Sequence, residues 1–355
     1  MFVGLGAVVT IGRKNRDLSQ GGLSELSESS DEGFLDIPLE CVEIAGQSLL
    51  ERMVERFAAM GIERIAILLE EAASVQMPRF RAEYPNVTVK IVRDLYSAIT
   101  QELSDFSQSE IGHAFIASTN AYAETDLLDL FSFHREARQA ATRTHDQYGL
   151  LDLWVVDCEK AQRGDLDSFL REAGTDGAPK YFVREYVNRL EHPRDLRRFA
   201  VDILKRNCET GPCGTQLRPG VWVDTGADIH RRARIVAPAY VGCASKVKAD
   251  ALITRLSNIE RDCCIDSGTV VEDSSILANT SVGICLDLCH AVASGNQLWN
   301  LERDVTVKIV DASVMRFSSA SRRAVNNGHQ IGSTALLEKT QMPETWQHGN
   351  NLIQE

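Results

Sequence analysis

Three basic side chains directly follow the first apolar run of the chain. The run covers residues 2–9, and Arg13, Lys14 and Arg16 come after it. Guanidinium and ammonium groups form charge-assisted hydrogen bonds with phosphate oxygens, so this stretch is a candidate for binding a phosphate group. An exposed basic loop without a ligand would have the same composition, and it explains the pattern about equally well.

A second basic cluster lies near residue 200, in a charged stretch that also carries apolar residues at helical spacing. Its members are Arg194, Arg197, Arg198, Lys205 and Arg206. The spacing predicts a connecting helix over 194–206, with Pro193 near its start. The cluster could meet a phosphate, but we favour a solvated helix face because such charge runs are common on surfaces.

Short apolar runs alternate with amphipathic stretches before residue 160. Strands are expected at 2–9, 62–69, 87–92, 114–118 and 151–156, and helices at 48–60, 95–103 and 127–138. The first helix should begin with a capping box, Ser48 to Glu51, and close at Gly61. The alternation predicts an α/β fold with a doubly wound, mostly parallel sheet. Ligands bind outside the carboxyl ends of the strands in such sheets, which points to the loops after Val9 and Ser118.

A six-residue repeat occupies the second half of the chain. Aliphatic residues recur at every sixth position from Val223 to Leu277, and a small residue stands two positions before nearly all of them. This pattern is typical of a left-handed parallel β-helix, in which three hexapeptides form one coil. The small residue fits the corner of the coil, and the aliphatic residue fills its interior.

The repeat sets the expected domain organisation. Residues 1–215 are expected to form the α/β domain, and residues 216–283 the β-helix. A capping helix at Ile284–Leu298 and a strand at Val305–Val310 should make up 284–317, and 318–355 should be a loosely ordered tail. Exposed sheet edges must be capped or paired, so we expect a homo-oligomer formed through the β-helix.

Three stretches together carry a family resemblance. Residues 44–51 with Gly61-Ile62 are similar to an "IAGKPLLE…GI" segment, and residues 114–136 to "FLVVNGDxxxxxDL…FHR". With the hexapeptide region, they resemble sugar-phosphate nucleotidyltransferases of the mannose-1-phosphate guanylyltransferase and glucose-1-phosphate nucleotidyltransferase type. The resemblance covers roughly residues 1–283. It implies a nucleotidyltransferase-like fold, a nucleotide or sugar phosphate as ligand, and Mg²⁺ as cofactor if the protein is catalytic.

The chain departs from that family at the catalytic positions. Where the family has a glycine-rich loop, residues 11–18 contain only Gly12, although the basic residues of that stretch remain nucleotide-binding candidates. Leu39 stands at the family's lysine. Asn120, a further nucleotide-binding candidate, stands at a metal-binding aspartate, and a neutral amide is a poorer magnesium ligand than a carboxylate. Three departures together favour a transfer machinery that has been dismantled or replaced.

One family motif survives. Trp222-Val-Asp-Thr-Gly226 is similar to "WxDTG", in which the resemblance makes Asp224 a metal ligand. Val223 is also the first inward position of the hexapeptide repeat, and the repeat continues without a break. We therefore favour a structural role, with Asp224 facing solvent near a corner of the coil.

Composition excludes several classes of protein. The net charge of −12 argues against nucleic acid as a partner, and no apolar run is long enough to cross a bilayer. The first apolar run precedes the basic residues, the reverse of a secretory signal. Nine cysteines, an odd number in a long chain, suit reduced thiols. We therefore expect a cytoplasmic protein with no membrane partner.

Three functions remain open. The favoured one is a nucleotidyltransferase-like protein that binds a nucleotide or sugar phosphate and is non-catalytic or regulatory. The first alternative is an active sugar-1-phosphate nucleotidyltransferase. The second is a β-helix acyltransferase, which would need a histidine base, and His230 is the single histidine of the repeat.

Overall fold

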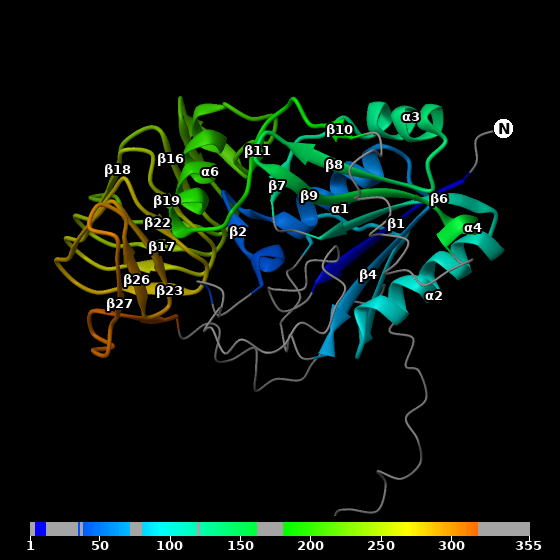
Figure 1. The fold of residues 1–355 in the computed structure, drawn as a ribbon. Coiled ribbons are helices and arrows are strands. Elements are labelled where there is room, and N and C mark those ends of the chain that lie inside the picture. Colours follow the sequence, from blue (N-terminus) through cyan, green and yellow to red (C-terminus); the bar gives the residue numbers. More distant parts are fainter. Residues whose placement is uncertain are drawn as a thin grey trace, which may run out of the picture.

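The computed structural model describes residues 4–11, 35, 38–71, 80–118, 121–161 and 180–318. Two regions lie side by side (Figure 1). One is a twisted sheet with helices packed on it. The other is a stack of short strands, into which the chain passes after helix α6 (Pro193–Lys205). The expected tail beyond residue 318 lies outside the described residues.

The first region is built on a mixed seven-stranded sheet rich in parallel pairs, in the order β10-β8-β9-β6-β1-β4-β5. Its strands are β1 (Gly4–Ile11), β4 (Arg64–Glu70), β5 (Val87–Val92), β6 (Ile111–Ser118), β8 (Ala141–Asp146), β9 (Gly149–Asp157) and β10 (Tyr181–Phe182). β1 pairs in parallel with β4 and β6, and β4 with β5. The strand expected at 151–156 is present as β9, but it runs antiparallel to β6 and β8. A turn of two residues joins β8 to β9, and such a short connection permits only antiparallel pairing.

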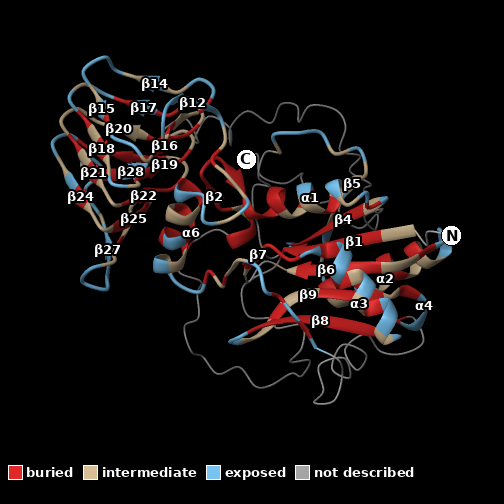
Figure 2. Ribbon diagram, turned by 90° about the horizontal axis from the view of Figure 1, so that it is seen from above, coloured by how far each residue is buried: buried red, intermediate tan, exposed pale blue. Residues whose placement is uncertain are grey.

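Helices cover both faces of this sheet. α1 (Leu49–Ala59) and α3 (Leu127–Ala137) share one core with the sheet, whereas α2 (Leu95–Gln108) and the short α4 (Cys158–Ala161) share the other. The central strands are therefore buried on both sides, as Figure 2 shows. Burial on both faces agrees with the continuous apolar sequences of these strands.

The start of α1 follows only half of the predicted capping box. The Ser48 hydroxyl accepts a hydrogen bond from the Glu51 backbone N–H at 3.1 Å, as expected. The Glu51 carboxylate does not reach back, because it accepts the backbone N–H of Arg81 instead. Gly61 closes the helix with φ +82°, a conformation that favours glycine.

The second region is built on three sheets of mainly parallel strands, which the chain visits in rotation. The first contains β13 (Val221–Val223), β16 (Ala239–Val241), β19 (Asn258–Ile259), β22 (Ser275–Ile276) and β25 (Ala291–Ser294). The second contains β14 (Asp228–Ile229), β17 (Lys246–Val247), β20 (Cys264–Ile265) and β23 (Thr280–Val282). The third contains β15 (Arg234–Ile235), β18 (Leu252–Thr254), β21 (Val270–Glu272) and β24 (Asp287–Cys289). Val221 pairs with Ala239 and Asp228 with Lys246, so one circuit takes eighteen residues. This agrees with three hexapeptides per circuit.

Toward the C-terminal end of the strand stack, each circuit is one residue shorter. Ile259 pairs with Ile276, seventeen residues later, so Ile276 occupies the interior column that was predicted for Leu277. Ile276 packs in the core of the strand stack, whereas Leu277 packs in the core shared with α6. One residue is lost at the corner before Ser275, where Asp273 has a left-handed φ of +43°. A second is lost between Leu288 and Ala293, because Ile276 pairs with Ala293, again seventeen residues later.

The helix predicted at Ile284–Leu298 is wrong, because this stretch forms β24, β25 and the start of β26 (Gln297–Asn300). Leu288 pairs with Val271 and Ala293 with Ile276, so the strand rotation continues beyond Gly283. The preceding circuit offers ready backbone partners, and these override the local preference for a helix. The strand expected near 305–310 is present as β27 (Val305–Lys308), and β28 (Met315–Phe317) closes the second sheet.

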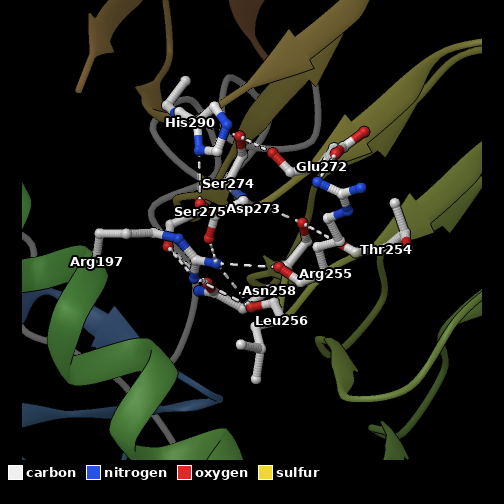
Figure 3. A network of polar contacts seen from close by, with 12 residues as sticks. Arg197, Thr254, Arg255, Leu256, Asn258, Glu272, Asp273, Ser274, Ser275 and His290 are labelled. Carbon is white, nitrogen blue, oxygen red and sulfur yellow. Dashed lines mark hydrogen bonds and ion pairs between the residues drawn. The ribbon is translucent and has the colours of Figure 1, made fainter. Parts of the chain in front are cut away.

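Helix α6 joins the two regions through one buried cation. Arg197 donates hydrogen bonds to the Leu256 carbonyl oxygen at 3.0 Å and to Asp273 Oδ1 at 2.8 Å. Asp273 Oδ2 lies 2.6 Å from His290 Nδ1, which extends the network across the strand stack (Figure 3). The favoured solvated face is therefore wrong for Arg197, although the Arg198 side chain of the same helix is 57% exposed.

Candidate functional site

A small pocket opens where β6 ends, at the edge of the sheet that the sequence singled out. Its volume is about 40 Å³, and it is bounded by α1, the end of β6, the start of α3 and β9. The walls are largely apolar and include Met53, Phe57, Tyr122, Leu127 and Leu151. Ser118, at the carboxyl end of β6, brings a hydroxyl to this edge.

Two charged side chains line the pocket, and both are engaged. The Arg56 guanidinium donates to the carbonyl oxygens of Ala123 and Thr125, which holds the segment between β6 and α3. The Asp152 carboxylate pairs with Arg143 at 2.5 Å. The lining therefore suits an apolar group better than a bare phosphate, and a volume of about 40 Å³ admits only part of a ring.

Asp224 is buried rather than solvent-facing, which corrects the favoured interpretation. It is 5% exposed, and its carboxylate pairs with Arg81 from the first region. The Tyr240 hydroxyl donates to Asp224 Oδ2 at 3.1 Å, and the Thr225 backbone N–H to Oδ1 at 2.7 Å. The side chain thus joins the strand stack to the sheet region.

This arrangement does not fit Asp224 as a magnesium ligand. Both carboxylate oxygens already accept hydrogen bonds, and one partner is a cation. Within the ranges that the structure describes, no group of three His, Cys, Asp or Glu side chains is placed to hold a metal ion. Mg²⁺ prefers several unencumbered oxygen ligands, so no chemical step is assigned to a metal at Asp224.

A second acid, Glu260, also joins the two regions. Its side chain is fully buried; Oε1 accepts the Ala45 backbone N–H at 2.7 Å, and Oε2 accepts that of Gly46 at 2.9 Å. The Asn258 side-chain amide donates to Oε1 at 2.7 Å. Burial raises the pKa of Glu260 to about 7, against the opposing effect of these donors.

The Glu260 contact gives the Ile44-Ala-Gly46 segment a structural role, because it holds the turn in that segment. Ala45 and Gly46 form the turn between β2 (Glu43–Ile44) and β3 (Gln47–Ser48), with φ +53° and +90°. A Cβ at Gly46 would collide with the Tyr240 hydroxyl group. Sequence reasoning missed Glu260, because it stands at an outward position of the repeat. The only signal was an acid directly after the interior residue Ile259, at the start of the third circuit.

The remaining sequence candidates are less informative. Arg13, Lys14, Arg16 and Asn120 lie outside the described residues. His230, the histidine considered for acyl transfer, is exposed in the first circuit, and its Nδ1 accepts the Arg232 backbone N–H at 3.2 Å. Of the residues predicted to bind nucleotide or metal in the family resemblance, the structure therefore describes only Asp224, and it places that residue in an ion pair.

Comparisons with known proteins find no match, either among models of protein families or among curated sequences. The family resemblance therefore rests on the three stretches of sequence alone.

Proposed function

We propose that this protein is a nucleotidyltransferase-like protein that binds a nucleotide or sugar phosphate without catalysing transfer. The pocket lies at the carboxyl end of β6, where ligands bind in α/β sheets. Its apolar walls suit the edge of a base or sugar ring. The family's "IAG" and "WxDTG" segments serve here to join the two regions.

The non-catalytic proposal rests on the hydrogen bonds and the ion pair of the Asp224 carboxylate. Transfer to a nucleotide phosphate needs charge neutralisation at the reacting phosphate. Here the surviving family carboxylate pairs with Arg81 and accepts a hydrogen bond from Tyr240. A carboxylate held in this way contributes to structure rather than to metal binding.

We further propose that the strand stack is a left-handed parallel β-helix and that it mediates homo-oligomer formation. The eighteen-residue circuit and the small residues two positions before the interior column support the first part. The second part is supported by the edge strands β12 (Thr215–Arg218) and β27, whose residues are all exposed.

Ligand-dependent melting tests the function most directly. The full chain is heated with each nucleoside triphosphate and with a panel of sugar-1-phosphates, with and without Mg²⁺, while pyrophosphate release is measured in parallel. At about 100 times Kd, a ligand should stabilise the protein by about 2.7 kcal/mol, which raises Tm by several degrees. Stabilisation without pyrophosphate release is the expected result.

A matched pair of variants locates the site. Ser118→Leu fills the pocket entrance and should abolish the ligand-induced rise in Tm. Ser104→Leu changes a half-buried serine on α2, which packs on the opposite face of the sheet, and should leave the rise intact. Pyrophosphate turnover would instead establish an active transferase, and stabilisation by acetyl-CoA alone would favour an acyltransferase.

A further inference from the structure

A second pocket lies at the opposite edge of the sheet, where β6 begins and β9 and α3 end. Its volume is about 290 Å³. The residues that line it are nearly all polar or charged and include His113, His134, Arg135, Arg138, Asp157 and Lys160. The proposed nucleotide site involves none of them.

The pocket carries excess positive charge in a chain whose net charge is −12. In the described ranges, neither Arg135 nor Arg138 lies within 4.0 Å of a carboxylate. Asp157 does not compensate them, because its carboxylate pairs with Lys160 Nζ at 3.1 Å and also accepts the Lys160 backbone N–H at 3.1 Å. Among the described residues, the two guanidinium groups at the rim therefore have no carboxylate partner.

Two histidines line the same pocket. Their rings meet edge to face with centroids 5.4 Å apart, and His134 Nδ1 lies 2.9 Å from the Thr142 hydroxyl oxygen. Among the described residues, His113 Nδ1 is buried with no hydrogen-bond partner. Burial lowers the pKa of both rings, to about 4 for His134, so both are neutral near pH 7. A buried N–H group without a partner is costly, so the proton of the neutral His113 ring is placed on Nε2, which is not among the buried atoms without a partner.

A simpler explanation accounts for only part of this arrangement. Cations are favourable at the carboxyl end of a helix, and Arg135 and Arg138 lie at the end of α3. That effect requires neither a concave surface nor a buried ring nitrogen without a partner. It also leaves unexplained why the one lining carboxylate is already paired.

We infer that this pocket binds a tetrahedral oxyanion of the phosphate class. Arg135 and Arg138 would supply the charge, and the neutral His113 ring would donate a hydrogen bond to one oxygen. The anion could be free phosphate or the phosphate group of a small monoester, because both present the same oxygens. Its binding does not depend on the nucleotide site.

Isothermal titration of the full chain with inorganic phosphate tests the inference, with glycerol phosphate as a second arm. We expect binding with Kd of about 1 mM or tighter. Arg138→Gln should weaken it at least about ten-fold, as expected for the loss of one charge-assisted contact. His113→Phe should weaken it several-fold while keeping a ring against Phe131. Tighter binding of the monoester would identify it as the source of the anion.

The matched control is Arg206→Gln. Arg206 ends α6 with φ +62°, just as Arg138 ends α3 with φ +52°, but it packs over the Trp222 ring. Phosphate affinity should be unchanged in Arg206→Gln and in Ser118→Leu. Absence of phosphate binding, or binding that Arg138→Gln and His113→Phe leave intact, would overturn the inference. A histidine C2–H resonance that is absent from the His113→Phe spectrum should shift with phosphate, which gives a second readout.

Discussion

Replacing Glu260 by glutamine should change how stability depends on pH. In the folded protein the carboxyl group has a pKa of about 7, compared with an ordinary value of 4.5. The folded state therefore binds more protons than the unfolded state between these values, and stability rises as pH falls from about 8 to about 5. A shift of this size corresponds to about 3 kcal/mol over that range. Glutamine does not titrate, so the variant should lack this gain.

The glutamine variant also has a cost that is independent of pH. One oxygen becomes an NH₂ group that faces the N–H of Ala45 or Gly46, and a buried unsatisfied donor costs about 1–3 kcal/mol. Near pH 8 this cost and the removal of the buried charge largely cancel. At pH 5 the wild type should exceed the variant by up to about 3 kcal/mol more than at pH 8.

Urea unfolding followed by tryptophan fluorescence gives the free energy of unfolding at pH 5 and at pH 8. The chain has four tryptophans to report it. Glu272→Gln is the control, because Glu272 is partly exposed and pairs with the exposed Arg255. It should change stability by less than about 1 kcal/mol at either pH. An equal difference between wild type and Glu260→Gln at pH 5 and pH 8 would refute the assignment of a buried, titrating Glu260.

Three further predictions follow from the contacts between the regions. Arg197→Met should lower the free energy of unfolding by about 1.5–3 kcal/mol, because the Leu256 carbonyl group and Asp273 Oδ1 both lose the Arg197 donor; Arg198→Met should change it little in the same urea titration. Gly46→Ala should cost more than Gly61→Ala, since both have positive φ but only Gly46 meets a neighbouring side chain; equal midpoints would contradict this. A double-mutant cycle with Arg81→Ala and Asp224→Ala should give a coupling of about 0.5–3 kcal/mol, and additive losses would show that the pair contributes nothing.

Local periodicity made much of the fold predictable. The strands at 87–92 and 114–118, the start of α1 at Ser48, and the interior column up to Val271 are all set by neighbours within one element or by one repeat. The sequence could not show where a repeat residue meets a distant segment. Asp224 and Glu260 occupy outward positions, and they are buried only because the 45–46 turn and Arg81 cover them.

The wrong helix at 284–298 has a related cause. Its apolar residues suited a helix locally, and strand pairing with the preceding circuit decided the outcome. The interior position predicted for Leu277 shows the same limit. A spacing of six residues fits Leu277, and because Ile276 is also apolar, the sequence does not show that one residue is missing from the circuit.

Among the described ranges no helix is long and apolar enough to cross a membrane.

The seventeen-residue circuit has a consequence for how this chain can change in length. Within a strand, side chains point alternately into the interior and outward. One inserted or deleted residue would therefore turn every later interior side chain of that strand outward. At the Asp273 corner the backbone turns and the alternation starts again, so the next interior residue, Ile276, comes one position early without disturbing the strand that follows. Length variation should therefore be tolerated at corners with left-handed residues, such as Asp250, Asp262 and Asn279, and rejected between them.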